Sequence, residues 1–425
     1  MKVKSLLLSM CAIAALASCS QSDDEIPGGS ESNAPAAKVI IKLAGSGEQA
    51  TSRAAGIPSD LDATNSTINN LTVFIFNQVG TVIKKEYIGT PATAGANTIQ
   101  TTTDAKRVAV VANTGDLTGA GGLFASVASE DALKAVVLDM LSNPTDPTGA
   151  LTHKDDNLYM SGVDNLTAFA DDGHGGQSAS VTVHLHFPSV RLSLTSISFN
   201  GGTVTDNKYV TNDLFATTAD ANFTIDRVYL MNAQRTTHIL PTTDGGSDYI
   251  TQDLKKYTGG VAWGDPWTGT APNGYQPNKE YTIETGLTTD SPTGLGANKI
   301  SSVGHWYTFA NTGVSNIANH PTALVVQVTW RKTKADATAN PAIAEENQIL
   351  YFTTYFGGGD KDELKAGNAY NLALKLNGNF KPSDTGGTGG GGTTDPTQPT
   401  VNSSVEVTVT PASWNVVNIP DKEWH

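Results

Sequence analysis

Short runs of apolar residues, many of them alternating with polar ones, recur through most of this chain. They include residues 71–76, 107–113, 181–187 and 349–356, and Gly, Asn, Asp and Pro residues separate them. Alternation with a period of two is typical of strands that bury one face, and the separating residues favour turns. The pattern therefore predicts an all-β chain built of β-sandwiches.

One segment, residues 129–141, has the period of a helix instead. Ser129 is suited to cap it, and Glu130 and Asp131 are suited to its first turn. Its apolar side chains share one stripe, formed by Leu133, Val136, Val137, Met140 and Leu141. We predict one short helix here, in the first domain, that covers one face or end of a sheet.

A change of alternation at Pro188 marks a domain boundary. Apolar and polar residues alternate through residues 181–187, and a new apolar–polar alternation begins at Val190. We therefore predict a first domain of residues 54–187 and a second domain of residues 188–380. No internal repeat is apparent in the sequence.

Residues 381–402 consist mainly of Gly, Thr, Pro, Ser and Asp and contain almost nothing to bury. This composition predicts a flexible linker, which spans at most about 70 Å when extended. Beyond it, residues 403–425 form a tail that begins with a strand-like alternation. The sequence thus predicts a detached strand tethered to the second domain.

The chain begins with the layout of a secretory signal. Two lysines supply the charge, residues 6–16 supply the apolar stretch, and small residues precede Cys19. We predict a signal of residues 1–19 with a lipid attached at Cys19. Cys11 leaves with this signal, so the mature protein has no disulfide. The acidic run 22–25 is either a solvated tether or an address for export to the outer leaflet.

Arg53 is the only basic residue between Lys42 and Lys84, and its neighbours are small and polar. Such a segment is accessible to a protease. A cut between Arg53 and Ala54 would remove residues 20–53 together with the lipid. The alternative is an ordinary surface arginine.

The propeptide of residues 20–53 contains the first predicted strand, whose apolar positions are Val39, Ile41 and Leu43. Its removal would open a groove in the first domain. The tail presents the same period at Val405, Val407 and Val409. Because strand pairing reads alternate side chains, we predict that the tail enters such a groove as a donor strand. The alternative is that the tail pairs in its own sheet as an edge strand.

The charge of the chain excludes some partners. The formal net charge is −14, and it lies beyond Arg53, because residues 1–53 hold five basic and five acidic residues. An acidic chain without basic clusters argues against binding to nucleic acid or to anionic membrane surfaces. We therefore expect neither kind of partner.

The sequence contains no motif of an enzyme, such as a nucleophile elbow, a phosphate loop or HExxH. We expect no catalytic residue, no cofactor and no metal. His184 and His186 share one strand face, but no third ligand accompanies them, so we interpret them as exposed polar positions. Residues 171–176 lack the ligand order of a calcium loop and are interpreted as an ordinary loop.

One aromatic cluster, formed by Trp263, Trp267 and Tyr275, has two interpretations. Exposed tryptophans on a β-sandwich loop stack on sugar faces, which would suit a glycan-binding adhesin. Alternatively, these rings pack the loop onto its own domain, which we favour.

In their order along the chain, these features resemble the fimbrillins, the structural subunits of type V (lipoprotein-derived) fimbriae, and above all the minor-fimbrillin-like branch. The resemblance covers Cys19, Arg53, residues 108–113, residues 158–162 and the ending at residues 404–409 with Trp414. It implies two transthyretin-like β-sandwich domains in tandem and export as a lipoprotein. It also implies trimming by an arginine-specific surface protease and assembly by donor-strand exchange.

Within the family, Arg53 together with Val405–Val409 favours a shaft-type structural subunit, because anchor subunits tend to keep the lipid and to lack a free C-terminal strand. We expect the subunit to be lipidated at the cell outer membrane before cleavage and extracellular, in the fimbrium, afterwards. The expected partners are other copies of the chain, anchor and tip subunits, and a host surface or other bacteria. One alternative is a monomeric surface lipoprotein that binds glycans through Trp263 and Trp267. Another is a tip or anchor subunit.

Overall fold

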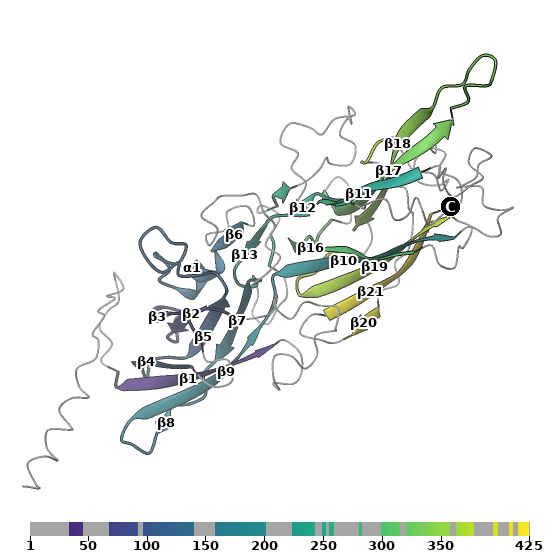
Figure 1. Cartoon of the computed structure of the whole chain (residues 1–425). Coiled ribbons are helices and arrows are strands. Elements are labelled where there is room, and N and C mark those ends of the chain that lie inside the picture. Colours follow the sequence, from purple (N-terminus) through teal and green to yellow (C-terminus); the bar gives the residue numbers. More distant parts are fainter. Residues whose placement is uncertain are drawn as a thin grey trace, which may run out of the picture. The chain divides into compact units, whose positions relative to one another are not determined.

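The computed structural model describes residues 34–45, 68–91, 97–139, 158–200, 223–242, 249–251, 255–258, 280–282, 299–314, 320–333, 335–357, 363–377, 394–397, 408–410 and 415–424. In these ranges the chain forms strands and one short helix (Figure 1). The predicted all-β class is therefore confirmed. No helix among the described residues is both long enough and apolar enough to span a membrane.

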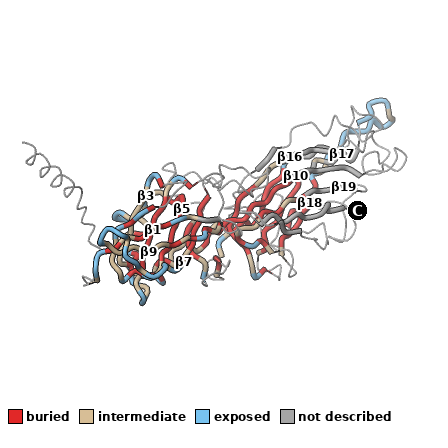
Figure 2. Tube along the Cα trace, turned by 90° about the horizontal axis from the view of Figure 1, so that it is seen from below, coloured by how far each residue is buried: buried red, intermediate tan, exposed pale blue. Residues whose placement is uncertain are grey.

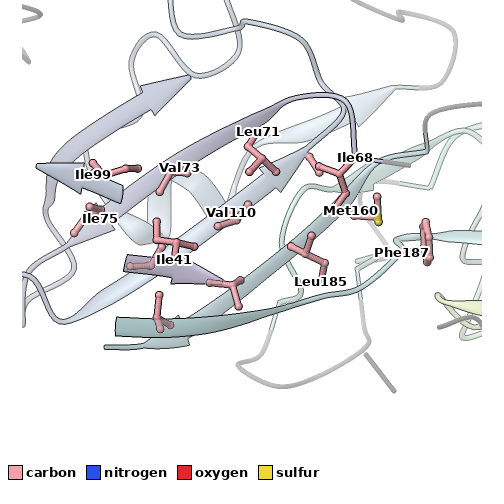
Figure 3. Close-up of a cluster of buried hydrophobic side chains, with 14 of the residues drawn as sticks. Ile41, Ile68, Leu71, Val73, Ile75, Ile99, Val110, Met160, Leu185 and Phe187 are labelled. Atoms are coloured by element: carbon pink, nitrogen blue, oxygen red, sulfur yellow. The ribbon is translucent and has the colours of Figure 1, made fainter. Parts of the chain in front are cut away.

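The first half of the chain forms two four-stranded sheets, with strand orders β4-β1-β9-β8 and β3-β2-β5-β7. Their bounds are β1 (Ala36–Gly45), β2 (Leu71–Phe76), β3 (Val82–Ile88), β4 (Asn97–Thr102), β5 (Arg107–Ala112), β7 (Met160–Asn165), β8 (Ala170–Asp171) and β9 (Gln177–Leu185). Alternate residues of the two sheets face each other and form one buried cluster (Figure 3). Leu71, Val73 and Ile75 come from one sheet, and Ile41 and Leu185 come from the other. These two sheets make a β-sandwich.

The helix α1 (Glu130–Lys134) begins as predicted but ends early. The Ser129 hydroxyl accepts a hydrogen bond from the Ala132 N–H at 3.1 Å, and Leu133 is fully buried. The segment that leads into α1 covers the face of the β2 sheet turned away from the core, because Phe124 packs edge-on against Phe74 at 5.4 Å. This cover precedes the helix in the chain, so the role of the helix itself as a cover stays a prediction.

The predicted extent of the helix, residues 129–141, is wrong. Residues Val137–Asp139 form strand β6, which pairs antiparallel with β13 (Thr236–His238) from the second half of the chain. The Arg235 guanidinium also contacts the Asp139 carboxylate at 2.8 Å. Pairing with a strand distant in sequence overrides a local helical period, since the β-branched Val136 and Val137 favour strands.

The second half of the chain forms sheets with strand orders β16-β10-β19-β21-β20 and β15-β11-β17-β18. Their bounds are β10 (Ser189–Asn200), β11 (Phe223–Met231), β15 (Glu280–Thr282), β16 (Lys299–Phe309), β17 (Thr322–Thr333), β18 (Glu346–Phe356), β19 (Asn368–Asn377), β20 (Thr408–Thr410) and β21 (Asn415–Trp424). A small pair joins β12 (Ala233–Gln234) and β14 (Tyr257–Thr258). Figure 2 shows that buried residues follow the strands in both halves. Pro188 lies between β9 and β10, where the predicted boundary falls.

The two halves repeat one topology, although no repeat is apparent in the sequence. Strands β1, β2, β3, β4, β5, β7 and β9 correspond in order to β10, β11, β15, β16, β17, β18 and β19. Corresponding pairs run in the same sense. For example, β1 pairs antiparallel with β4 and parallel with β9, and β10 pairs antiparallel with β16 and parallel with β19. Beside β9, the place that β21 takes beside β19 is held by the two-residue β8, which is antiparallel and not parallel, so β20 and β21 are additions to the repeated set.

A close approach between the two sheets of the first sandwich requires a glycine. A Cβ atom on Gly162 in β7 would collide with the His184 carbonyl oxygen in β9. We expect Gly162→Ala to destabilise the first sandwich by roughly 1–3 kcal/mol, because backbone must move to admit the methyl group. Gly119→Ala is the matched control, since nothing lies within 4 Å of its added Cβ. Urea unfolding of both variants measures the difference, and equal midpoints would contradict the close approach.

Candidate assembly site: the first strand and the tail

Strand β1 occupies an interior place in its sheet, although it comes from the predicted propeptide. Residues 36–41 pair antiparallel with β4, and residues 37–45 pair parallel with β9. Both edges of β1 are therefore hydrogen-bonded over most of its length. Removing it would leave unpaired backbone groups on β4 and β9, facing each other across an empty strand position.

The side chains of β1 complete the core of the first sandwich. Val39 and Ile41 have no exposed surface, and Leu43 packs partly buried against the same cluster. The burial of these side chains is what their alternation predicts. Fully burying an aliphatic side chain of this size contributes about 1.5–3 kcal/mol. The place of β1 in the sandwich is therefore a groove lined by Ile99 and Val181 on its two flanking strands.

The other face of β1 is held by one ion pair. The Lys38 ammonium lies 2.7 Å from the Asp172 carboxylate in the turn between β8 and β9. The Lys38 contact, followed by the backbone N–H groups of His174 and Gly176, holds the pKa of Asp172 well below its ordinary value. Asp172 thus stays ionised and keeps its attraction for β1.

The same contacts account for the acidic loop of residues 171–176. The Asp171 carboxylate accepts a hydrogen bond from the Gly173 N–H at 2.8 Å, and that of Asp172 accepts from the His174 N–H at 2.9 Å. These are turns in which aspartate side chains bind nearby backbone. Among the described residues, no group of three or more His, Cys, Asp or Glu side chains is placed to hold a metal ion.

His184 has a carboxylate neighbour that the sequence analysis missed. Asp164 in β7 lies 20 residues away in sequence, and its carboxylate accepts a hydrogen bond from the His184 N–H at 2.8 Å. The ring Nδ1 of His184 lies 3.3 Å from the same carboxylate oxygen. His186 is only partly exposed, and burial, followed by the nearby His184, lowers its pKa. Asp164 of β7 therefore holds His184 of β9, and this contact explains His184 without a metal ion.

The tail differs from its prediction. We predicted a detached strand, but β21 pairs parallel with β19 over residues 415–424, and β20 pairs antiparallel with β21. The tail therefore adds two strands to the edge of its own second sandwich, as the edge-strand alternative held. The physical reason is that β19 ends the repeated sheet, and its unpaired edge is a template for another strand.

Strands β1 and β21 each have one antiparallel and one parallel neighbour. β1 lies between an antiparallel strand (β4) and a parallel strand (β9). β21 lies between an antiparallel strand (β20) and a parallel strand (β19), and β19 is the counterpart of β9. Both strands span ten residues. The tail thus forms a ten-residue strand with one parallel and one antiparallel neighbour, as β1 does, but on the edge of β19 opposite to the one that pairs with β10, the counterpart of β1.

Several predicted site residues lie outside the described part of the chain. They are Cys19, Arg53, Ala54, Trp263, Trp267, Tyr275, Val405, Val407 and Trp414. Val409 belongs to β20, where its register partner is Val417. Lipidation, cleavage, strand donation and glycan binding at these positions therefore stay predictions.

The predicted linker is not free along its whole length. Residues 394–397 are described, and Pro396 and Thr397 are buried. The Thr353 and Tyr355 hydroxyls in β18 donate hydrogen bonds to the carbonyl oxygens of Pro396 and Thr397. The sequence signal that was missed is Asp395-Pro396-Thr397, a turn motif in an otherwise Gly-rich and Thr-rich stretch.

The fold and the candidate site define an all-β protein of two tandem sandwiches, with one chain end built into a sheet and the other added at a sheet edge. Two family models match it. "Major fimbrial subunit protein (FimA)" matches residues 37–187, and "FimA-like major fimbrial subunit protein, C-terminal domain" matches residues 267–414. The chain belongs to the fimbrillin family, whose members are subunits of cell-surface fimbriae.

The chain is also similar to solved structures. A proposed cell adhesion protein from Bacteroides eggerthii is 26% identical, with a TM-score of 0.57 over 92% of this chain and 100% of that chain. A fimbrilin from Porphyromonas gingivalis is 13% identical, with a TM-score of 0.47 over 91% of this chain and 97% of that chain. A comparison with curated protein sequences gives no match. The first of these structures is similar over nearly the whole of both chains.

Proposed function

We propose that this protein is a shaft-type structural subunit of a cell-surface fimbrium that polymerises by donor-strand exchange. In this mechanism, the precursor is exported as a lipoprotein through Cys19 and held at the outer membrane. An arginine-specific surface protease cuts after Arg53, and β1 leaves with the propeptide. The tail of another copy then fills the groove, and the resulting fimbrium supports adhesion to a host surface or to other bacteria.

One observation carries this proposal: cleavage would remove β1 from the first sandwich, and the second sandwich has two strands, β20 and β21, beyond the set that both sandwiches share. β1 lies upstream of Arg53 yet fills an interior strand position of the first sandwich. β20 and β21 lie outside the strand set that the two sandwiches share. Moving the tail of one copy into the first sandwich of the next would complete both sets.

The capacity of the tail to form strands supports the same exchange. The groove would take a strand between β4 and β9. The tail already forms two strands: β21, which runs parallel to β19, and β20, which contains Val409 and runs antiparallel to β21. In its own sheet, the tail ends at β20, whose far edge faces no further strand of that sheet. In the groove, a strand would be hydrogen-bonded on both sides, and alternate side chains would enter the core. For β20, which has one neighbour in its own sheet, the exchange would add a second.

The pairing of the tail with its own sheet favours a second candidate function. A monomeric surface lipoprotein would keep β20 and β21 at this edge permanently, and would bind glycans through the Trp263 and Trp267 loop. A tip or anchor subunit is a further possibility within the family. The two ends of the mature chain distinguish these functions, because only the shaft subunit loses its lipid and donates its tail to another subunit. None of the three functions requires an enzyme activity or a cofactor.

The N-terminal residue of the protein on cells tests the proposal. We expect protein released from the cell surface to begin at Ala54 and to carry no lipid, as measured by mass spectrometry of the intact chain. Arg53→Ala should leave the lipidated form that begins at Cys19. A wild-type protein that still carries residues 20–53 would favour the anchor or the monomeric lipoprotein instead.

A further inference from the structure

A short stretch of the predicted linker is docked on the second sandwich. The Thr353 hydroxyl donates a hydrogen bond to the Pro396 carbonyl oxygen at 2.6 Å, and the Tyr355 hydroxyl donates to the Thr397 carbonyl oxygen at 2.7 Å. Both acceptor residues are buried, and Thr397 has no exposed surface. Residues 394–397 therefore form an attachment, which we call the clasp.

The clasp has a fixed local shape. The Asp395 carboxylate accepts hydrogen bonds from the Thr397 N–H at 2.9 Å and from the Thr397 hydroxyl at 2.7 Å. Pro396, between them, has a restricted backbone angle. This turn closes on itself and leaves the carbonyl groups of Pro396 and Thr397 for the hydroxyls of β18. Little conformational freedom is therefore lost when the clasp docks.

The surface beneath the clasp is one face of the β15-β11-β17-β18 sheet. Its strand register places Thr353 opposite Val325, and Tyr355 opposite Ala323. A buried cluster lies on the same face, formed by Tyr229, Met231, Ala323, Val325, Tyr351 and Tyr355. The clasp thus combines two hydrogen bonds with contact to an apolar sheet face.

The Tyr355 hydroxyl keeps its proton where the clasp needs a donor. Burial, and secondly the nearby Asp395 carboxylate, raises the pKa of Tyr355 above its ordinary value. Tyr355 therefore remains neutral and able to donate at neutral pH.

We propose that the clasp, and not the end of β19, is the point from which the tail is tethered, both in the monomer and in the fimbrium. This inference rests on the donor-strand exchange proposed above. Between the clasp and the tail lie only residues 398–402, which span at most about 17 Å. Without the clasp, residues 381–402 would span about 70 Å. In the fimbrium, the clasp therefore limits the distance between the second sandwich of one subunit and the first sandwich of the neighbour that receives its tail.

Two matched deletions test where the tether begins. Removing residues 390–392 shortens the linker before the clasp, and removing residues 400–402 shortens it after the clasp. Each deletion takes out about 10 Å of extended chain. We expect loss of residues 400–402 to slow the formation of linked subunits at least tenfold, and loss of residues 390–392 to change it less than twofold. Equal effects of the two deletions, in a wild type that assembles, would overturn the inference.

A double substitution opens the clasp without removing the linker. Thr353→Val with Tyr355→Phe keeps the side-chain volume and removes both hydroxyl donors. In this background the two deletions should become equivalent, because either one leaves a tether of 19 residues. A tenfold difference that persisted in this background would show that the hydroxyls do not hold the tether.

Hydrogen exchange in the uncut, full-length precursor tests the clasp separately from assembly. We expect the Thr397 amide to exchange at least tenfold faster in the double variant than in wild type, while the amides of β21 are unchanged. Unchanged exchange at Thr397 would contradict the clasp. If the wild-type protein never assembles, the proposed function fails, and this measurement still decides whether the clasp exists.

Discussion

Protein cut by trypsin at Arg53 is expected to form a ladder of linked subunits, and protein lacking residues 403–425 is expected to form none. The tail supplies the strand that fills the vacated groove, so its loss leaves every groove empty. Both sandwiches should stay folded, because β20 and β21 lie outside the strand set that the two sandwiches share. Native gel electrophoresis after limited digestion measures the ladder, and circular dichroism measures the fold.

A single substitution in the tail should have nearly the same effect. Val407→Asp places a carboxylate where the donor strand enters the core, and an unpaired buried charge costs several kcal/mol. That cost offsets most of the gain from burying the neighbouring valines. Thr408→Asp is the matched control, since its side chain has the opposite parity along the strand. Ladders of equal strength from wild type, the deletion and Val407→Asp would contradict donor-strand assembly.

Arg53→Ala should block the ladder for a different reason, because β1 then keeps the groove filled. This variant separates the two steps of the mechanism. A subunit with an intact tail and an occupied groove can still donate its strand but cannot accept one. Mixing it with cut wild-type protein should therefore cap the growing chains, and shorter ladders should result.

The strands that carry an apolar alternation could be predicted from the sequence, because a period of two reports which face of a strand is buried. Val39 and Ile41 in β1 are fully buried as that period requires. The position of β1 between β4 and β9 could not be predicted, since pairing partners far apart in sequence leave no local signal. The repeated topology could not be predicted for the same reason, since the two halves share strand order and strand direction but no evident sequence repeat.

Local patterns were misleading where a distant segment supplied the pairing partner. Residues 137–139 have a helical period but pair with β13. The tail has the composition of a detached strand but pairs with the open edge of β19. Asp164 approaches His184 only because β7 and β9 pack across the sandwich at Gly162. In each case, a contact between elements decides the structure, and the residues nearby in sequence do not record it.

Shortening one side chain of β1 should destabilise the precursor and leave the assembled protein unaffected. Ile41 has no exposed surface, so Ile41→Ala is expected to cost about 2–5 kcal/mol in the uncut chain. For a sandwich of this size, each kcal/mol lowers the unfolding midpoint by roughly 2–4 °C. After cleavage and exchange, β1 is gone, and the tail of a neighbour occupies its place. The midpoint of the first sandwich in the assembled form should then equal that of wild type.

Val181→Ala is the matched control, because Val181 lines the same groove from β9 and stays in the chain after cleavage. It should lower the unfolding midpoint of the precursor and of the assembled protein alike. Differential scanning calorimetry on both forms of both variants measures the four midpoints. If Ile41→Ala lowered the midpoint of the assembled form as much as that of the precursor, β1 would still be in place, and the groove would never have received a donor strand.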